Sequence, residues 1–408
     1  MTRQNFAPSD FEVIVVSDGS TDDTLEAARG FSALLQLLVV EQPNSGPAAA
    51  RNRGAGQAHG ELLVFLDDDT EPQPQFLAAH VRAHRQNPNL VLMGYLPPVL
   101  GSQRGFFRTE LLGWWEVIFQ RMRQPGHHFG YTDLLSGNFS LRRDLFERVG
   151  GFNPEFQCHE DYEFGVRLQQ LGADFAFSDE ALAFHHESSD LRRSVQRKYA
   201  EGAADVQLGR LYPYVRPALL MTRLQKYARW PSRVLQFLAF SLPGAGRTIT
   251  TLLLPLLSFF DRLKAYRIWQ RLLYGLLGYW YWRGVAEKMG SAREVKAFIA
   301  VGNQAANEFG TSLKVDLAEG IAHAEALLDA CRPDRAQIFF KQHWIGRLPA
   351  QLGGEKLRGC HLKPLLVTDL LVPLARALAQ EGVIELVPEN QERFDSWCDE
   401  AYQQSDLA

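Results

Sequence analysis

Residues 61–72 read E-L-L-V-F-L-D-D-D-T-E-P, an apolar segment that runs straight into three aspartates. The continuous apolar run 62–66 is typical of a strand buried on both faces. The carboxylates 67–69 would repel one another unless a cation lay among them, and Mg²⁺ or Mn²⁺ prefers oxygen ligands and commonly also holds substrate phosphates. Ligands of open α/β sheets bind at the carboxyl ends of the strands, so we expect a metal site here. The alternative is a polar loop that caps a helix beginning near Pro74.

The composition is that of an ordinary globular protein. The 408 residues are 46% hydrophobic and carry a net charge of -4, which gives no reason to expect nucleic acid as a partner. The N-terminal residues contain no apolar core typical of a signal peptide, and the sequence has no long uninterrupted apolar run typical of a membrane-spanning helix. The four cysteines show no metal-ligand spacing.

The charge is unevenly distributed along the chain. Residues 206–286 contain twelve Arg or Lys and a single acid. The composition shifts predict three regions: an α/β domain over 1–209, a basic and apolar helical region over 210–290, and a small C-terminal α/β module over 291–408. In the last of these we expect helices near 316–331 and 368–380 and strands near 336–340 and 365–367.

Strands and helices alternate over the first ~100 residues, which indicates a parallel, doubly wound sheet. The predicted strands are 11–17, 37–41, 61–66 and 91–96. Farther along, the apolar spacing and the capping residues predict the helices 106–121, 160–171 and 191–209.

Four sequence blocks stand in one order along the first half of the chain. They are E-V-I-V-V-S-D-G-S-T-D-D-T (12–24), N-S-G-P-A-A-A-R-N-R-G (44–54), F-L-D-D-D-T-E-P (65–72) and S-G-N-F-S-L-R-R-D-L-F-E-R-V-G-G-F (136–152), the last leading into H-E-D-Y-E-F-G-V-R-L (159–168). Each block is weak by itself. Together they resemble glycosyltransferase family 2, whose members are inverting enzymes of the GT-A fold.

The resemblance covers roughly residues 10–205 and implies a Rossmann-like, mostly parallel sheet with flanking helices. Members of the family normally begin with a strand of the type V-S-V-V-I-P-T-Y-N and a helix, ahead of the segment that matches Phe11. The present sequence has only ten residues there, so the usual first strand is expected to be absent. A sheet that lacks this strand would expose strand edges.

The resemblance also implies roles for the first three blocks. Asp18 would hydrogen-bond the nucleotide base. Asp67 and Asp69 match the family's Asp-x-Asp, where the later carboxylate binds Mn²⁺ or Mg²⁺ and the first lies toward the ribose or the metal; Asp68 lies between them. Arg51 would meet base or phosphate, or else be an ordinary surface arginine.

On the acceptor side, Glu160 and Asp161 match the family's Glu-Asp pair. Asp161 is the candidate base that removes the proton of the attacking hydroxyl, and plain N-terminal acids of a helix are the alternative. His185 ends a predicted strand where the family often has a histidine that completes the metal site. The other residues assigned to the acceptor side are Gly137, Asn138, Trp114 and Trp115.

The basic and apolar region contains a segment typical of a helix that lies in a membrane interface. Along 263–284, Lys264, Arg267 and Arg271 fall on one helical face, and Trp269 and other apolar residues cover the rest. We therefore expect contact with an anionic membrane surface. The alternative is a helical module packed on the first domain with its arginines in solvent.

These patterns favour a metal-dependent enzyme that transfers a sugar from a UDP-, GDP- or dTDP-sugar to a hydroxyl of a glycan or lipid-linked acceptor. It would work in cell-surface or lipid-linked glycan synthesis, in the cytoplasm at the inner face of the cell membrane. A second hypothesis is a glycosyltransferase-like binding or scaffold protein, impaired by the absent strand. A nucleotidyltransferase also uses metal-binding carboxylates but has no use for the block at 136–168.

Overall fold

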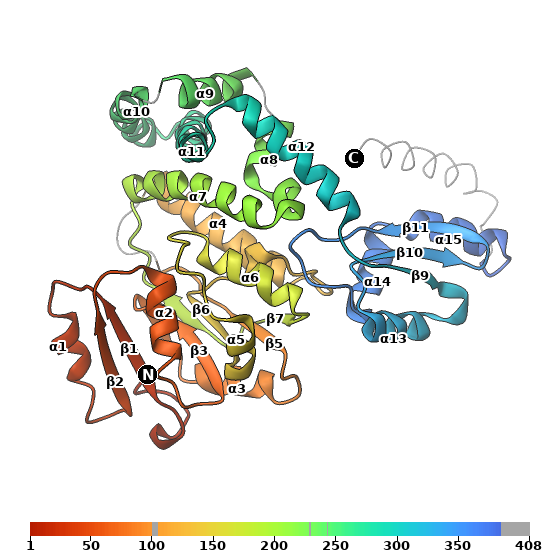
Figure 1. The fold of residues 1–408 in the computed structure, drawn as a ribbon, viewed down its shortest axis with the longest axis horizontal. Helices are drawn as coiled ribbons and strands as arrows, with labels where there is room; N and C mark the ends of the chain where they lie inside the picture. The colour runs from red at the N-terminus through yellow and green to blue at the C-terminus, as the bar shows by residue number, and fades with distance from the viewer. Residues whose placement is uncertain (100–104, 228–229, 243, 385–408) are drawn as a thin grey trace. The chain divides into compact units, whose positions relative to one another are not determined.

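The computed structural model describes residues 1–99, 105–227, 230–242 and 244–384 (Figure 1). The chain divides into two compact units. The first consists of Met1–Arg123 and Phe129–Glu308, and the second of Gln124–His128 and the chain from Phe309 onward. Residues 210–290, expected as a separate helical region, thus share a unit with the predicted α/β domain.

A mixed four-stranded sheet lies at the centre of the first unit. Its strands, in spatial order, are β3 (Leu62–Leu66), β6 (Asn138–Arg142), β5 (Leu90–Gly94) and β7 (Asp174–Ser178). Strands β5 and β7 are parallel, and β6 runs antiparallel to both of its neighbours. Leu66 pairs with Asn138, so the end of β3 lies beside the start of β6. The apolar run before the aspartates is therefore a strand of the central sheet, as predicted.

A second, two-stranded parallel sheet is formed by β1 (Val13–Asp18) and β2 (Leu37–Gln42). The predicted α/β architecture, a sheet with parallel strand pairs and flanking helices, is confirmed, and β6 is the antiparallel strand within it. Among the described residues, β1 pairs only with β2, and β3 pairs only with β6. The other edge of β1 and of β3 therefore has no described strand beside it. The apolar residues of β1 accordingly stay half-buried.

Helices pack along these sheets and enclose an aromatic core. They are α1 (Thr24–Arg29), α2 (Pro47–Ala55), α3 (Phe76–His84), α4 (Phe106–Met122), α5 (Arg143–Val149), α6 (Glu160–Gln170) and α7 (Leu191–Leu211), with short 3-10 helices at Pro8–Asp10, Tyr131–Asp133 and Pro213–Ala218. The predicted helices at 106–121, 160–171 and 191–209 are confirmed. Rings from β3 and β6 stack in the core, with Phe65 and Phe139 centred 4.7 Å apart. Phe152 and Phe164 stack beside them at 4.3 Å, so α6 is fixed to the sheet by aromatic contacts.

A helical layer completes the first unit. It comprises α8 (Leu220–Lys226), α9 (Trp230–Ser241), α10 (Ala245–Arg262), α11 (Tyr266–Lys288) and α12 (Ala292–Glu308). Helices α7 and α11 cross at Gly202 and Gly284, where an added Cβ would lie about 2 Å from a carbonyl oxygen of the opposite helix. None of the described helices has the length and apolarity needed to cross a membrane.

The close crossing with α7 corrects the expectation for 263–284. Most apolar side chains of α11 are buried inside the protein, Trp269, Leu273 and Leu276 among them. Most of its aromatic residues therefore lie in the protein core, whereas Tyr266 and Tyr274 are exposed. The cations Arg267 and Arg271 remain exposed at the start of the helix.

The second unit contains a three-stranded sheet in the order β11 (His343–Leu348), β10 (Arg335–Phe340) and β9 (Ser312–Asp316). The 3-10 helix Leu317–Glu319 and the helices α13 (Ile321–Cys331), α14 (Gly359–Thr368) and α15 (Leu371–Gln380) accompany it. The α/β composition expected for the C-terminal module is thus present. The strand predicted at 365–367 is wrong: these residues belong to α14, where Leu362 and Leu366 are buried one helical turn apart.

Two histidines are buried between α3 and the central sheet. The ring of His80 lies 2.7 Å from the Ser140 hydroxyl and 3.1 Å from the Asn138 side-chain oxygen. His84 lies 2.8 Å from the same hydroxyl. Burial lowers the pKa of His80 to about 3 and that of His84 to about 4. Both rings are therefore neutral in the folded protein at neutral pH.

We predict that acid destabilises the fold through these two rings. A histidine whose pKa is lowered by folding takes up its proton first in the unfolded chain, so stability is lost as the pH falls below 6.5. Each ring should lower the free energy of unfolding by about 1.4 kcal/mol per pH unit, down to its own folded pKa. Urea titrations between about pH 7 and pH 5 measure this slope. His80→Asn should reduce this slope by about 1.4 kcal/mol per pH unit, the contribution of one proton. His59→Gln, which removes an exposed ring, should leave the slope unchanged. Equal slopes in the wild type and both variants would contradict the prediction.

Candidate active site

The turn after β3 brings the first aspartate close to β6. The backbone N–H of Asp67 donates to the carbonyl oxygen of Gly137, 3.1 Å away, and the Thr70 hydroxyl donates to the carbonyl oxygen of Asp67 at 2.6 Å. A Cβ on Gly137 would lie 2.9 Å from a carboxylate oxygen of Asp67. Gly137, expected on the acceptor side, thus provides the room in which the Asp67 carboxylate sits. Asp68 is exposed at the tip of the turn.

Arg51 joins this turn to the start of α6. One guanidinium nitrogen lies 2.9 Å from Asp67 and another 2.8 Å from Glu160, and the arginine side chain is only 16% exposed. Burial alone would lower the pKa of Arg51, but the charges of Asp67 and Glu160 raise it, so the arginine stays charged. The arginine is therefore no free surface residue. The expected contact with a base or phosphate would have to compete with these two ion pairs.

The carboxylate pair at the start of α6 is held asymmetrically. Burial and the neighbouring charge of Asp161 raise the pKa of Glu160, while Arg51 opposes that rise. Asp161 is half-buried, and its carboxylate accepts hydrogen bonds from the Ser136 hydroxyl at 3.4 Å and from the Tyr162 backbone N–H at 2.9 Å. Of the two acids, Glu160 carries the ion pair and Asp161 is the one available to a substrate.

The residue before α6 sets the direction in which the backbone enters that helix. His159 has a left-handed backbone, with φ of 61°, which is uncommon outside glycine. Its ring lies 3.2 Å from Asp205 of α7, and the Tyr281 hydroxyl of α11 donates to the same carboxylate at 2.5 Å. Burial works against a charge on His159, but Asp205 raises its pKa above the ordinary value. Helices α7 and α11 thus hold the turn that presents Glu160 and Asp161.

The third aspartate lies beside a histidine because two short strands pair. Strands β4 (Thr70–Pro72) and β8 (Ala183–His185) are antiparallel, and Thr70 pairs with His185. The Nε2 atom of His185 lies 3.2 Å from a carboxylate oxygen of Asp69. Its Nδ1 atom faces Glu187 at 3.9 Å and is buried without a hydrogen-bond partner in the described part of the chain.

Asp69 and His185 fit as two ligands of a divalent ion. Two atoms that each bind one ion at about 2.1 Å lie roughly 3 Å apart when they are adjacent ligands, which is close to the observed spacing. A histidine ligand commonly donates its other N–H to a carboxylate, the place that Glu187 occupies. Asp67 is not brought to this pair, since Arg51 holds it, and within the described ranges no three His, Cys, Asp or Glu residues are near enough together to bind a metal.

Asp18, at the end of β1, uses its carboxylate inside the protein. It accepts hydrogen bonds of 2.8 Å from the Gln42 side chain and from the backbone N–H groups of Ser45 and Gly46. Burial would raise the pKa of Asp18, and these hydrogen bonds lower it overall. The carboxylate therefore ties β1 to the loop before α2. A nucleotide base would have to compete for it.

Three residues assigned to the acceptor side have different surroundings. Asn138 is buried: its amide donates to the carbonyl oxygens of Ala181 and Tyr95, and its oxygen faces His80. It has no group left for a sugar, so that assignment is wrong. Trp114 donates to the Tyr274 hydroxyl of α11 at 3.3 Å. Trp115, by contrast, meets the ring of His185 edge-on, with centroids 5.7 Å apart, and thus lies beside the Asp69 pair.

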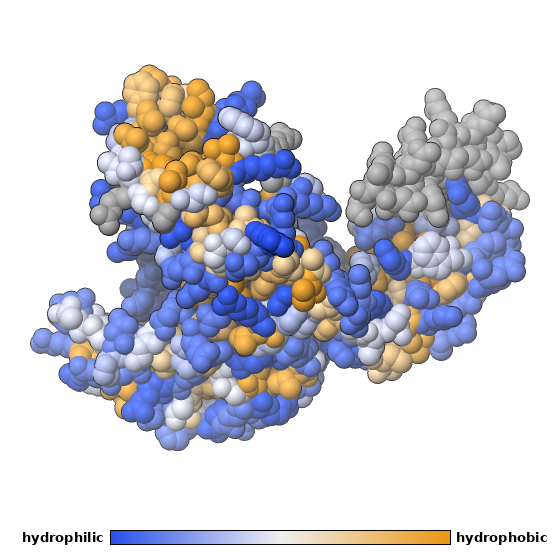
Figure 2. Space-filling view, turned by 45° about the horizontal axis from the view of Figure 1, so that its top comes forward, coloured by the Kyte–Doolittle hydropathy of each residue, from blue (hydrophilic) through white to orange (hydrophobic). Residues whose placement is uncertain are grey.

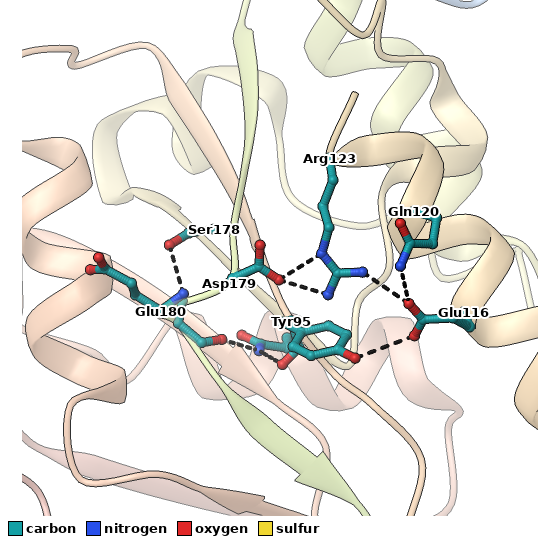
Figure 3. Close-up of polar contacts among 9 residues, drawn as sticks. Tyr95, Glu116, Gln120, Arg123, Ser178, Asp179 and Glu180 are labelled. Carbon is teal, nitrogen blue, oxygen red and sulfur yellow. Dashed lines mark hydrogen bonds and ion pairs between the residues drawn. The ribbon is translucent and has the colours of Figure 1, made fainter. Parts of the chain in front are cut away.

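Arg123 forms a clamp at the end of α4, the helix that carries Trp115 (Figure 3). Arg123 lies over the ring of Tyr95, 4.3 Å from its centroid, donates to Asp179 at 2.7 and 2.8 Å, and contacts Glu116 at 3.1 Å. The hydrogen bonds to Asp179 raise the pKa of Arg123 further above its ordinary value. Because Tyr95 and Asp179 follow β5 and β7, the clamp fixes α4 to the ends of these two strands.

Glu187, Ser136, His159 and Asp205 are the supporting residues that sequence reasoning missed. Glu187 could have been found, because it follows the histidine pair directly at the end of a predicted strand. Asp205 lies in the middle of a long helix and carries no local signal.

Comparison with known proteins supports the resemblance in sequence. Residues 2–150 match the family model described as "Glycosyl transferase family 2". A validoxylamine A glucosyltransferase of Streptomyces hygroscopicus subsp. limoneus is 34% identical over 212 residues, 44% of this chain and 46% of that protein. Glycosyltransferase AglE of Haloferax volcanii is 43% identical over 191 residues, 45% of this chain and 60% of that protein.

Among solved structures, the mannosyltransferase PcManGT of Pyrobaculum calidifontis superposes with a TM-score of 0.46 at 18% identity, over 70% of this chain and 80% of that one. The chain spans about half the length of the first curated relatives it matches. The matched segment contains β1, α2 and β3 with Asp18, Arg51 and the aspartates 67–69. In this N-terminal part, the chain is similar to members of glycosyltransferase family 2.

Proposed function

We propose that this protein transfers a sugar from a nucleotide-sugar to an acceptor hydroxyl, with inversion, using a divalent ion. The observation that carries the proposal is the Arg51 bridge, which brings the Asp67 turn and the Glu160–Asp161 pair to one place, with the Asp69–His185 pair on the same turn. The family assignment of residues 2–150 and the names of the relatives, several of them glycosyltransferases, support this reaction class.

In the proposed reaction, Asp161 accepts the proton of the acceptor hydroxyl as the oxygen attacks the anomeric carbon. The bond from that carbon to the phosphate oxygen breaks, and the nucleoside diphosphate leaves with the electron pair. Asp69 and His185 would hold Mn²⁺ or Mg²⁺, which supplies charge stabilisation to the departing diphosphate. Arg51 holds Glu160 in an ion pair beside Asp161, which leaves the more exposed Asp161 carboxylate to meet the acceptor hydroxyl.

The acceptor class follows less directly from the chain. One relative is named as an O-antigen biosynthesis protein and another as a chondroitin synthase. We therefore propose a glycan or lipid-linked sugar as acceptor, reached from the inner face of the cell membrane.

A glycosyltransferase-like binding protein is the second candidate. Two observations favour it: the separation of β1–β2 from the central sheet, and the use of Asp18 in internal hydrogen bonds. Calorimetry with Mn²⁺ and a panel of UDP-, GDP- and dTDP-sugars separates the candidates. Binding without hydrolysis or transfer would select the binding protein.

We predict that Asp161→Asn lowers the rate of donor hydrolysis or transfer by roughly 10²–10⁴-fold, because the amide cannot take up the proton. Donor affinity should change little. Asp69→Ala should instead abolish the dependence of the rate on Mn²⁺. Asp144→Asn, a carboxylate removed from an exposed site on α5, is the matched control. A rate for Asp161→Asn equal to that of the control would contradict the assignment.

The bridge itself is tested by Arg51→Met. A buried carboxylate that loses its partner costs roughly 3–5 kcal/mol, so the free energy of unfolding should fall by about that amount at neutral pH. The loss should shrink at low pH, where Glu160 takes up a proton. The double variant Arg51→Met with Glu160→Gln should recover most of the stability, because the buried charge is gone and only the more exposed Asp67 carboxylate is left without its partner. Failure of the second change to recover stability would show that the bridge is not the cause.

The role of Glu187 beside His185 can be tested through the dependence of activity on Mn²⁺ concentration. If it orients His185, Glu187→Gln should raise the Mn²⁺ concentration for half-maximal activity by roughly 10–100-fold. Glu71→Gln, which removes the exposed partner of His186, should leave it unchanged. An equal shift in both variants would point to a general loss of negative charge.

A further inference from the structure

We propose that the outer face of α9 and α10 is a docking surface for an anionic lipid bilayer. The inference concerns a surface formed by the helical layer and does not depend on the reaction assigned to the active site. It narrows the sequence expectation of membrane association for residues 210–290, in which the interfacial helix was placed at 263–284, to the outer face of α9 and α10.

The docking surface consists of two apolar stripes at helical spacing. On α9, Trp230, Val234 and Phe237 recur after four and three residues, and Trp230 is 77% and Phe237 63% exposed. On α10 and its C-cap residue, the stripe is formed by Leu252, Leu256, Phe259 and Leu263, all exposed. Figure 2 shows hydrophobic side chains gathered over this end of the molecule. Side chains of this kind one turn apart form a continuous apolar face.

The opposite faces of the same two helices are used inside the protein. Ala239 of α9 and Leu257 of α10 are buried, and both helices pack against α11. The exposed stripes are therefore separate from the faces with which α9 and α10 pack inside the protein. Each helix has one apolar side in the core and a second apolar side turned outward.

The surroundings of the stripes are cationic. Arg262, Lys264, Arg267 and Arg271 follow one another at the end of α10 and the start of α11, and all are exposed; Arg233 is exposed on α9. The single acid between residues 206 and 286 is Asp261, which already lies near the Phe106 backbone N–H and Lys264. An apolar face with Trp and Phe, bordered by basic residues, is the combination that lies in the head-group region of an anionic leaflet.

Charge also decides against a second copy of the chain as the occupant. In a two-fold symmetric contact the same patch meets itself, so the cations of one copy would face those of the other. Such like-charge contacts are unfavourable. A bilayer with anionic head groups satisfies both the apolar stripes and the cations around them.

The experiment is co-sedimentation of the full chain with vesicles of phosphatidylcholine alone or with added phosphatidylglycerol. We expect binding to the anionic vesicles, weakened by salt and much weaker on neutral ones. The triple variant Arg262→Glu, Arg267→Glu, Arg271→Glu should lower the affinity roughly 100-fold or more. Phe237→Asp with Phe259→Asp should abolish binding, whereas Phe31→Asp with Val301→Asp, which alters equally exposed apolar residues elsewhere, should not.

A second readout places the surface in the bilayer. Brominated lipid should quench the fluorescence of the protein, and Trp230→Phe should remove most of that quenching. Donor hydrolysis in vesicle-free buffer and thermal melting show that each variant is folded and separate this proposal from the active-site one. Equal binding of the Phe237/Phe259 variant and its control, or no binding to anionic vesicles by the wild type, would overturn the proposal. So would a concentration-dependent dimer that the same variant abolishes.

Discussion

The guanidinium of Arg51 is the contact on which the arrangement of the site depends. It lies between a carboxylate that follows β3 and one that begins α6, more than ninety positions apart in the chain. Without a cation there, Asp67, Glu160 and Asp161 would bring three negative charges to one half-buried place, and burial makes such repulsion costly. One arginine thus allows the turn after β3 and the start of α6 to share a site.

Much of the fold and part of the site could be predicted from sequence, because the signals there are local. The apolar run before the aspartates and the helix after His159 follow from periodicity and capping. The place of His185 near Asp69 was expected from the family resemblance, and the pairing of β4 with β8 brings the two together. What failed depends on partners distant in the chain. Asn138 reads like a polar loop residue, yet its amide is used up by Tyr95 and Ala181 inside the core. Nothing near it in sequence reveals that.

The helical layer illustrates the same limit on a larger scale. By composition, α11 is the helix best suited to a membrane interface, with its tryptophans, tyrosines and arginines. Two glycines decide otherwise: Gly202 and Gly284 let α7 and α11 approach until backbone meets backbone, and most aromatics of α11 become core. Helices α9 and α10 then carry the exposed apolar side of the helical layer. A pattern read along one helix cannot show which neighbour will cover it.

The crossing of α7 and α11 also reaches the active site. Asp205 of α7 receives the hydroxyl of Tyr281 from α11 and faces the ring of His159, whose left-handed backbone starts the helix with Glu160 and Asp161. A boundary drawn at residue 209, where the composition changes, would remove Tyr281 and leave the buried Asp205 with one partner fewer. Helix α11, against which α9 and α10 pack, is therefore part of the support of the carboxylate pair. For this reason the α/β part and the helical layer behave as one unit, although their compositions differ.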